Sequence, residues 1–438
     1  MQRVLSWGRY PYEPQLARTV AWRDEIAVAW RDATAACGTT LGFGNGRSYG
    51  DSCLAASGEV VHTLLLDRLI AADWQTGVVR AEAGITLGHI LALALPHGWM
   101  LPVTPGTQYA TLGGALANDV HGKNHHVRGT FGCHVRRFSL LRSDGTRLAC
   151  TPESEAAFFA ATIGGLGLTG LIEWVEIQLM PVRSSRIDVT RIRFDNLDGF
   201  FALSEQLDPL HEYSVAWVDC LGSGKSLGRG VFMAGDHAAE GPLALAARRT
   251  RTVPFTMPVP VFNDITLRVM NEAYFRRQRA REAHFAMDCD TFFYPLDALQ
   301  EWNRIYGRAG FQQYQCVIPP DAARDALREM LDAIARSGTG SFLAVLKRCG
   351  DVASPGWLSF PREGTSLALD FPQREASNRR LFERLDAIVR EVHGRQYPAK
   401  DAHMSGEDFR TAYPRWEQVE ALRDPALLSR FWERTTRT

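Results

Sequence analysis

The sequence predicts an α+β protein with more than one domain. Its 438 residues exceed what one ordinary hydrophobic core accommodates. Short strands and helices alternate over residues 20–180, where glycine is dense. After about residue 182, longer strands and amphipathic helices predict one antiparallel sheet with helices on one face. From Tyr397 onward the chain becomes short, polar and motif-like again.

Apolar runs and alternating patterns give the strands of the first part. They are expected at 60–66, 78–83, 136–141, 146–150 and 172–179. Ser143, Asp144 and Gly145 separate the third strand from the fourth, so this pair is predicted to form a hairpin. Thr86 precedes apolar residues at helical spacing, so it is expected to cap a helix that ends at Pro96.

The second part repeats the strand and helix patterns at greater length. Strands are expected at 187–194, 214–220, 311–318, 342–348 and 367–371. Helices are expected at 198–206, 322–337 and 377–392. Asp198 is the expected N-cap of the first of these helices.

The overall composition limits the class of protein and of partner. The formal net charge is zero, so no basic excess indicates a nucleic-acid partner. The N-terminus lacks a secretory apolar region, and no stretch has the roughly 18 apolar residues of a membrane span, so we expect a soluble cytoplasmic protein. Eight scattered cysteines without CxxC pairs are expected to be reduced and buried, and not disulfides or zinc ligands.

One proline-rich stretch leaves two interpretations open. Arg248, Arg249 and Arg251 precede residues 253–262, in which three prolines exclude a regular helix or a central strand. The stretch is either a loop that packs on its own domain or an arginine-flanked apolar flap. Such a flap, over 248–262, would touch a lipid or the inner membrane surface.

Three glycine-rich motifs predict a phosphate or ring-binding site in the first part. They are Gly42 to Asp51, Pro102 to Thr107 with Thr111 to Ala117, and Gly164 to Gly170. Glycines let backbone N–H groups approach an anion closely. The first motif does not have the G-x-G-x-x-G spacing of a Rossmann fold, because Arg47 stands where the third glycine would be.

Two further motifs carry polar side chains suited to catalysis. His121 to His126 holds three histidines, but no acidic or cysteine ligand accompanies them and Gly122 interrupts the run, so no metal site is predicted. A polar active-site loop fits better, because histidine exchanges protons near neutral pH. His125 and His126 remain open to a structural role. The other motif is Tyr397 to Asp401.

In this order, the five motifs resemble those of the FAD-binding oxidoreductases of the vanillyl-alcohol-oxidase family. A narrower resemblance is to the oxidase subunits of decaprenylphosphoryl-ribose 2′-epimerases. It is carried by the motifs Ser6 to Arg9, Gly46 to Asp51, Val120 to His126, Tyr213 to Asp219, Gln313 to Gln315 and Ala399 to Asp401. The resemblance implies a PCMH-type FAD-binding fold, with an FAD domain (1–182), an inserted antiparallel-sheet substrate domain (183–395) and a C-terminal segment (396–438) completing the FAD domain.

The resemblance also implies which residues hold FAD. These are Asn45, Gly46, Arg47, Ser48, Tyr49, Pro105, Gly106, Thr107, Thr111, Gly113, Gly114, Asn118, His121, Gly122, Gly167, Gly170, Ile172, Tyr397 and Lys400. Many relatives bind flavin covalently through a histidine in the first loop. Arg47 occupies that place here, which implies non-covalent FAD. Cys133 and His126 are the alternative covalent anchors.

The catalytic residues implied by the resemblance are His121, Tyr49 and Lys400. We expect His121 to accept the proton of a substrate hydroxyl, Tyr49 to hydrogen-bond the substrate and Lys400 to stabilise reduced flavin. The expected substrate-side residues are Gln315, Lys347, Trp217 and Ser366. The chain departs from the narrower family where an asparagine and a cysteine are replaced by Ser366 and Ala368.

The expected function is oxidation of a sugar hydroxyl to a ketone, with the 2′-hydroxyl of a polyprenyl-phosphoryl ribofuranose as the leading substrate. A short-chain dehydrogenase/reductase partner would then complete epimerisation to the arabinose form. Two alternatives stay open: oxidation of a soluble sugar, alditol or aldonolactone, and a flavin-binding electron-transfer subunit. The presence of Tyr49, His121 and Lys400 together disfavours the second alternative.

Overall fold

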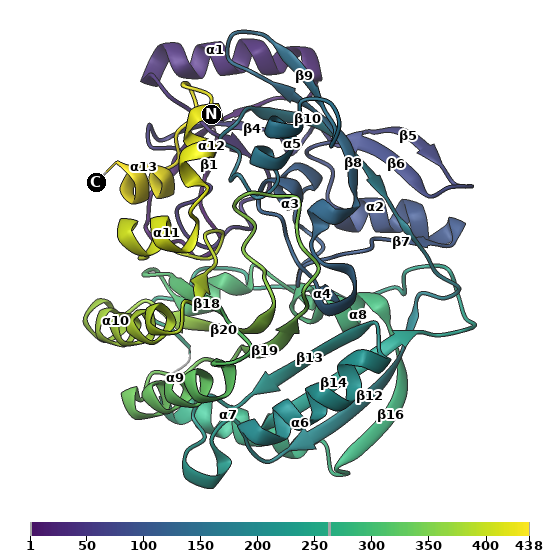
Figure 1. The fold of residues 1–438 in the computed structure, drawn as a ribbon, viewed down its shortest axis with the longest axis vertical. Coiled ribbons are helices and arrows are strands. Elements are labelled where there is room, and N and C mark those ends of the chain that lie inside the picture. Colours follow the sequence, from purple (N-terminus) through teal and green to yellow (C-terminus); the bar gives the residue numbers. More distant parts are fainter. Residues whose placement is uncertain (1, 262–263, 438) are drawn as a thin grey trace.

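The computed structural model describes residues 2–261 and 264–437 (Figure 1). Purple and blue elements of the N-terminal half form the upper part, with the yellow C-terminal helices beside them, and teal and green elements form the lower part. Helices and mainly antiparallel sheets confirm the predicted α+β class. None of the described helices is long and apolar enough to cross a bilayer.

A small four-stranded sheet carries the first glycine motif. Its order is β1 (Gln2–Val4), β2 (Gln15–Thr19), β4 (Glu59–His62) and β3 (Gly42–Phe43), and the last three strands run parallel. Helix α1 (Ile26–Cys37) buries Ile26 and Trp30 against this sheet. Because β3 ends at Phe43, the glycine-rich residues that follow leave the sheet edge as a loop.

A five-stranded antiparallel sheet forms the rest of the upper part. Its order is β5 (Leu69–Asp73), β6 (Val78–Glu82), β10 (Leu171–Gln178), β8 (Val135–Leu141) and β9 (Arg147–Cys150). The predicted β8–β9 hairpin is confirmed. Thr86 caps α2 (Leu87–Ala94) as predicted, since its side chain accepts from the His89 N–H at 3.2 Å. Short elements complete this part: β7 (Trp99–Met100), α3 (Leu112–Ala117), α4 (His125–Arg128), α5 (Ala156–Thr162) and β11 (Met180–Pro181).

One eight-stranded sheet, antiparallel throughout, organises the lower part. Its order is β16 (Glu282–Asp288), β12 (Arg186–Phe194), β14 (Gly230–His237), β13 (Tyr213–Val218), β19 (Ala344–Cys349), β20 (Gly364–Pro372), β18 (Phe311–Ile318) and β21 (Arg395–Gln396). The shortest strand, β21, leads directly into the Tyr397 motif, so the sheet edge positions that motif.

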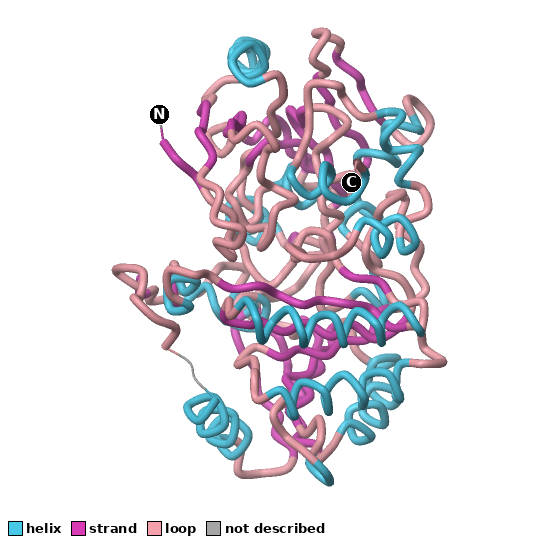
Figure 2. Tube along the Cα trace, turned by 90° about the vertical axis from the view of Figure 1, so that its left-hand side faces the viewer, coloured by secondary structure: helices cyan, strands magenta, loops and turns pink. Residues whose placement is uncertain are grey.

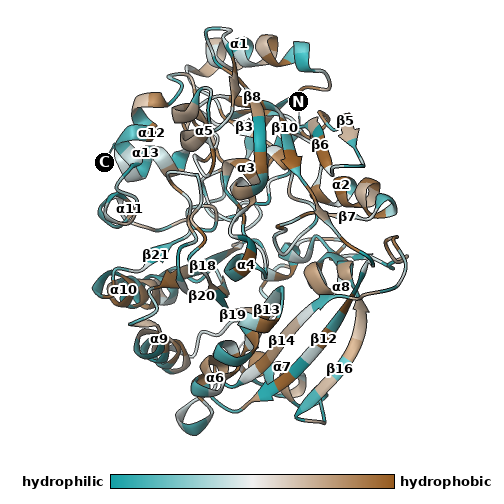
Figure 3. Cartoon of the chain, turned by 45° about the vertical axis from the view of Figure 1, so that its right-hand side comes forward, coloured by the Kyte–Doolittle hydropathy of each residue, from teal (hydrophilic) through white to brown (hydrophobic). Residues whose placement is uncertain are grey.

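Three amphipathic helices cover one face of this sheet: α6 (Leu197–Leu207), α9 (Ala323–Ser337) and α10 (Glu375–Glu391). Figure 3 shows both hydrophobic and hydrophilic residues on α9 and α10, as a helix between core and solvent requires. Helix α7 (Asp264–Arg277) lies elsewhere, to the left of the strands in Figure 2 after the grey trace. The remaining elements here are β15 (Arg251–Thr252), α8 (Cys289–Phe293) and β17 (Leu299–Gln300).

The C-terminal helices pack on the N-terminal sheets. They are α11 (Gly406–Ala412), α12 (Trp416–Leu422) and α13 (Arg430–Thr436). Phe409 and Trp432 share a buried core with Leu41 and Phe43. The Thr40 N–H donates to the Ala426 carbonyl at 2.9 Å, which ties the two ends of the chain together.

Two expectations need correction. The N-cap of α6 is Asn196 and not Asp198, because the extended backbone at Asn196 lets its side chain accept from the Gly199 N–H at 3.1 Å. Asp198 instead pairs with Arg324. The cysteines were expected to be buried, but Cys37 is exposed at the end of α1, and Cys53, in a turn, and Cys133, in a short 3-10 helix, are only half-buried. Phe262, at the end of the proline-rich stretch, lies outside the described residues.

Candidate active site

A cavity of about 1030 Å³ lies between the glycine-rich loops and the face of the eight-stranded sheet opposite α6, α9 and α10. Small-molecule sites usually enclose roughly 300–1000 Å³, so this one has room for a large cofactor together with a substrate. Strands β13, β18, β19 and β20 contribute side chains from below, and the loops after β3 and α3 contribute them from above.

Every residue expected to bind cofactor or substrate lines this single cavity. The loop residues are Asn45, Gly46, Arg47, Ser48, Tyr49, Pro105, Gly106, Thr107, Thr111, Gly113, Gly114, Asn118, His121, Gly122, Gly167, Gly170, Ile172, Tyr397 and Lys400. The sheet residues are Trp217, Gln315, Lys347 and Ser366. The two suggested covalent anchors lie elsewhere: the Cys133 thiol donates to the Ala353 carbonyl, and Nε2 of His126 donates to the His211 carbonyl.

The upper part of the cavity fits a dinucleotide. Gly46 has a φ of +58°, which a side chain would strain, and a Cβ on Gly113 would lie 2.9 Å from that of Ala83. Buried Nε of Arg47 and Oγ of Ser52 face this space without a hydrogen-bond partner among the described residues. Buried polar atoms normally have partners, so these two indicate a missing polar ligand. The guanidinium of Arg47 is held over the Trp7 ring, 4.1 Å from its centroid.

His121 lies at the catalytic end with both ring nitrogens engaged. Its Nδ1 contacts Nζ of Lys347, and its Nε2 lies 3.2 Å from the side-chain amide of Gln315. Nζ of Lys347 also donates to the Gly122 carbonyl at 2.7 Å. Burial, reinforced by the charge of Lys347, holds the pKa of His121 well below its usual range. The imidazole is therefore neutral near pH 7, and Nε2 is the nitrogen available to a ligand that displaces Gln315.

The other histidines of the motif take structural places. His125 is fully buried and does not line the cavity, and burial lowers its pKa to about 3. His126 bonds to the His211 carbonyl at 3.0 Å.

Lys123, by contrast, lines the cavity and donates to the Phe293 carbonyl at 3.3 Å. Burial and the nearby Lys347 lower the pKa of Lys123 to about 8.

A second cluster of titratable groups joins Lys400, Tyr49 and Asp370. Nζ of Lys400 lies 3.6 Å from the centroid of the Tyr49 ring. Gln313 donates to the Asp370 carboxylate and also hydrogen-bonds Tyr49. Burial lowers the pKa of Lys400 and raises that of Asp370, so these two groups are close to exchanging a proton near neutral pH. Burial raises the pKa of Tyr49, which therefore stays a neutral hydrogen-bonding group.

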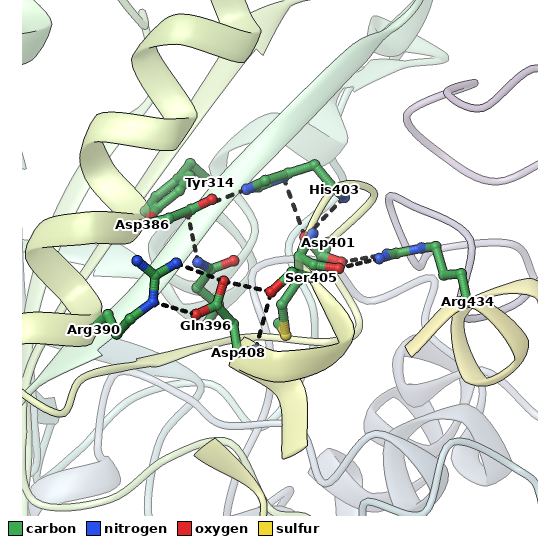
Figure 4. A network of polar contacts seen from close by, with 10 residues as sticks. Tyr314, Asp386, Arg390, Gln396, Asp401, His403, Ser405, Asp408 and Arg434 are labelled. Atoms are coloured by element: carbon green, nitrogen blue, oxygen red, sulfur yellow. Dashed lines mark hydrogen bonds and ion pairs between the residues drawn. The ribbon is translucent and has the colours of Figure 1, made fainter. Parts of the chain in front are cut away.

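A buried polar network fixes the loop that carries Lys400 (Figure 4). The next residue, Asp401, pairs with Arg434 of α13, and its Oδ1 lies 3.2 Å from Nδ1 of His403. His403 in turn lies 3.4 Å from Asp386 of α10, which accepts from the Tyr314 hydroxyl at 2.9 Å. Lys400 is thus anchored from both the sheet and the C-terminal helices.

The substrate-side residues of the sheet lie beside His121. Nε2 of Gln315 is 3.4 Å from Oγ of Ser366, and Gln315 is paired with Ala368 on the neighbouring strand β20. Trp217 donates its indole N–H to the Phe342 carbonyl at 3.1 Å and packs against Tyr274 of α7. Ser366 and Ala368 have smaller side chains than the asparagine and cysteine of the narrower family, and they leave this wall of the cavity open.

Asp370, Gln313 and Lys123 belong to the site but were given no role from the sequence. Asp370 had one signal, since it is a lone charge within the apolar run of a predicted strand. Lys123 lies inside the histidine motif, and the chemistry of that motif was assigned from the sequence to the histidines alone. Gln313 begins one of the motifs that carry the resemblance, but only Gln315 of that motif was given a role.

Comparisons with known proteins also indicate an FAD-binding site in this chain. The sequence profile of the FAD binding domain matches residues 14–151. Decaprenylphosphoryl-beta-D-ribose oxidase of Mycolicibacterium smegmatis is 34% identical over 441 residues, which cover 97% of this chain and 95% of that protein. An uncharacterized protein of Streptomyces coelicolor is 34% identical over 77% of this chain and 95% of its own length. L-gulonolactone oxidase of Mus musculus is 29% identical over 37% of each chain.

Proposed function

The chain belongs to the FAD-linked oxidoreductase family of decaprenylphosphoryl-β-D-ribose oxidase, and from this premise we propose that it oxidises the 2′-hydroxyl of a polyprenyl-phosphoryl ribofuranose to a ketone. It is a flavoenzyme that uses FAD and acts on CH–OH groups. The observation that carries the proposed chemistry is a neutral, buried His121 in the same cavity as Lys400 and the FAD-binding loops.

Oxidation removes a hydride from the carbinol carbon and a proton from its hydroxyl, which together leave a C=O bond. Bound FAD supplies the acceptor for the hydride. Nε2 of His121 takes the hydroxyl proton once the substrate replaces Gln315 as its neighbour. This step uses the tautomer whose Nδ1–H donates to the lone pair of a neutral Lys347, and burial favours that neutral amine because it lowers the pKa of Lys347. The contact of Nδ1 with Lys347 fixes the orientation of the ring.

The remaining roles follow from position. Lys400 and Tyr397 hold the cofactor from the C-terminal side, and the cation of Lys400 stabilises negative charge that develops there. Tyr49, Gln315, Ser366 and Trp217 contact the sugar. The loop residues from Asn45 to Ser48, the 105–107 turn and the glycines of α3 hold FAD, which we propose is non-covalent because Arg47 offers no nucleophile.

Segment organisation and partners belong to the same proposal. We assign residues 1–182 and 396–438 to the FAD domain and 183–395 to the substrate domain. The ketone needs a separate reductase to return it to the opposite alcohol, and a short-chain dehydrogenase/reductase is the proposed partner. The protein is proposed to act in the cytoplasm, peripheral to the inner membrane, through contacts that include residues 248–262.

Anaerobic reduction of the bound flavin tests the proposal directly. We expect polyprenyl-phosphoryl ribose to bleach the flavin absorbance, and ribose, alditols and aldonolactones to leave it unchanged. His121→Gln should keep the yellow colour and lose the bleaching. If a soluble polyol or lactone bleaches the flavin faster than the lipid-linked sugar, the proposed substrate is wrong. If nothing bleaches it, the result favours the alternative of a flavin-binding electron-transfer subunit.

A further inference from the structure

Part of the cavity lining is exposed to solvent. Five lining residues are exposed: Gly106, Pro295, Arg277 at the end of α7, Phe285 on β16 and Leu299 on β17. Tyr274, one turn before Arg277, lies further in against Trp217. The last three exposed residues mark one opening of the cavity, which α7, β16 and β17 border.

Exposed apolar side chains lie on two segments next to the elements that border this opening. Phe255, Val259 and Val261 are 61%, 67% and 50% exposed, on a segment held to β17 by the Val253 N–H to Gln300 carbonyl bond of 3.0 Å. Ile265 and Val269, on the first half of α7, are 76% and 63% exposed. We call these five residues the apolar rim; in Figure 2 they lie on the segments on either side of the grey trace.

The apolar rim is not explained by the cavity itself. None of its five residues lines the cavity. Single exposed apolar residues are ordinary, but five on two adjoining segments mark an interaction surface. A protein that only took up a soluble sugar would gain nothing from them.

Positive charge is concentrated around the same rim. Residues 248–281 contain eight arginines and two acidic residues, whereas the whole chain has a net charge of zero. Arg249 and Arg251 are exposed beside β17, and Arg277, Arg279 and Arg281 are exposed at the end of α7. The apolar rim is therefore bordered by cations on both sides, and the rest of the molecule carries the compensating negative charge.

We propose that the apolar rim and its arginines dock the enzyme on an anionic lipid bilayer, with the cavity opening toward the membrane. The apolar side chains insert at the boundary of headgroups and acyl chains, and the arginines contact lipid phosphates. This inference rests on the proposed function for its purpose, which is to admit a lipid-linked sugar. Each methylene group of a polyprenyl tail lowers the equilibrium constant for transfer of the tail from the bilayer into water about fourfold. The tail must therefore stay in the bilayer while its sugar enters the cavity.

Vesicle flotation of the full-length holoenzyme tests the docking without any substrate. The vesicles contain either phosphatidylcholine alone or equal parts of phosphatidylcholine and phosphatidylglycerol. We expect binding to the anionic vesicles that weakens with salt. The double variant Phe255→Ser with Val259→Ser should lower the partition coefficient about tenfold or more. Arg249→Glu with Arg251→Glu should remove most of the dependence on phosphatidylglycerol.

Leu210→Ser is the matched control, because Leu210 is 70% exposed but lies outside the rim. It should bind anionic vesicles like the unaltered protein. Flavin content and bleaching by a short-tailed, water-soluble substrate should be the same in all variants. The inference is overturned if the holoenzyme floats with neither vesicle, or if the rim variants float as well as the control. It is also overturned if the rim variants lose binding only to the reductase partner.

The docking and the proposed function can fail separately. Flotation that depends on the rim, without bleaching by any lipid-linked sugar, would keep the membrane surface and reject the substrate. Bleaching by the short-tailed substrate without flotation would keep the function and reject the surface.

Discussion

Replacing Lys347 by Met should move the pH dependence of flavin reduction. Nζ of Lys347 contacts Nδ1 of His121 deep in the cavity, and its charge is one cause of the low pKa of His121. Two unit charges about 4 Å apart interact by about 4 kcal/mol at an effective dielectric constant of about 20. Since a pKa change of one corresponds to about 1.4 kcal/mol, loss of a full charge would raise the pKa of His121 by at most about three.

The expected rise is smaller than this bound, because burial also lowers the pKa of Lys347 and so favours its neutral form. His121 must be neutral to accept a proton, so a higher pKa removes the base at a higher pH. Reduction by the unaltered enzyme should therefore persist to a lower pH than reduction by the variant, whose acid limb should move to higher pH.

Stopped-flow bleaching between pH 5 and 8, under anaerobic conditions, measures this acid limb. Lys123→Met is the matched control, since Lys123 is also buried and lines the cavity but is not among the groups that shift the pKa of His121. Its acid limb should match that of the unaltered enzyme, whatever its rate. An unchanged acid limb in Lys347→Met would refute the role of His121 as the base.

Three other predictions follow from the site. Inhibitors that bond to the active-site cysteine of the narrower family should form no adduct at Ala368 of the unaltered protein. The variant A368C should form an adduct there, as peptide mass mapping would show. An adduct on strand β20 of the unaltered protein would contradict this prediction. Lys400→Met should slow flavin reduction about 100-fold when FAD is saturating, whereas the surface variant Lys225→Met should not. Arg434→Met should lower the free energy of unfolding in urea by about 3 kcal/mol, because Asp51 and Asp401 lose their cation; a loss below about 1 kcal/mol would contradict the buried pairing.

Elements with strong periodicity were predictable from the sequence. The apolar pattern predicted strand β18 with its observed bounds, 311–318, and it predicted helix α9 with a start one residue before the observed one. It missed β16, which is an edge strand beside the cavity opening and exposes Phe285, so burial does not alternate along it. Helix α7 was missed for a related reason: it exposes Ile265 and Val269, so its sequence has no single apolar face.

The site itself was predictable only as a set of motifs. No local pattern could place Lys347 against His121, because their contact depends on how β19 lies in the sheet relative to the loop after α3. Asp370 remained without a role for the same reason. Its raised pKa depends on burial beside Gln313 and Lys400, which come from another strand and from the C-terminal segment.

Backbone hydrogen bonds explain how distant motifs nevertheless meet. The Tyr397 N–H donates to the Gln315 carbonyl at 3.0 Å, and the Tyr49 N–H donates to the Ala399 carbonyl at 2.9 Å. A Cβ on Gly50 would lie 1.6 Å from the Asp401 carbonyl oxygen, so only glycine lets these loops approach. The Lys400 loop is thus clamped between strand β18 and the first glycine motif. A small displacement of either would move the cation away from Tyr49, and the buried network of Figure 4 resists it because it holds Asp401, the residue after Lys400.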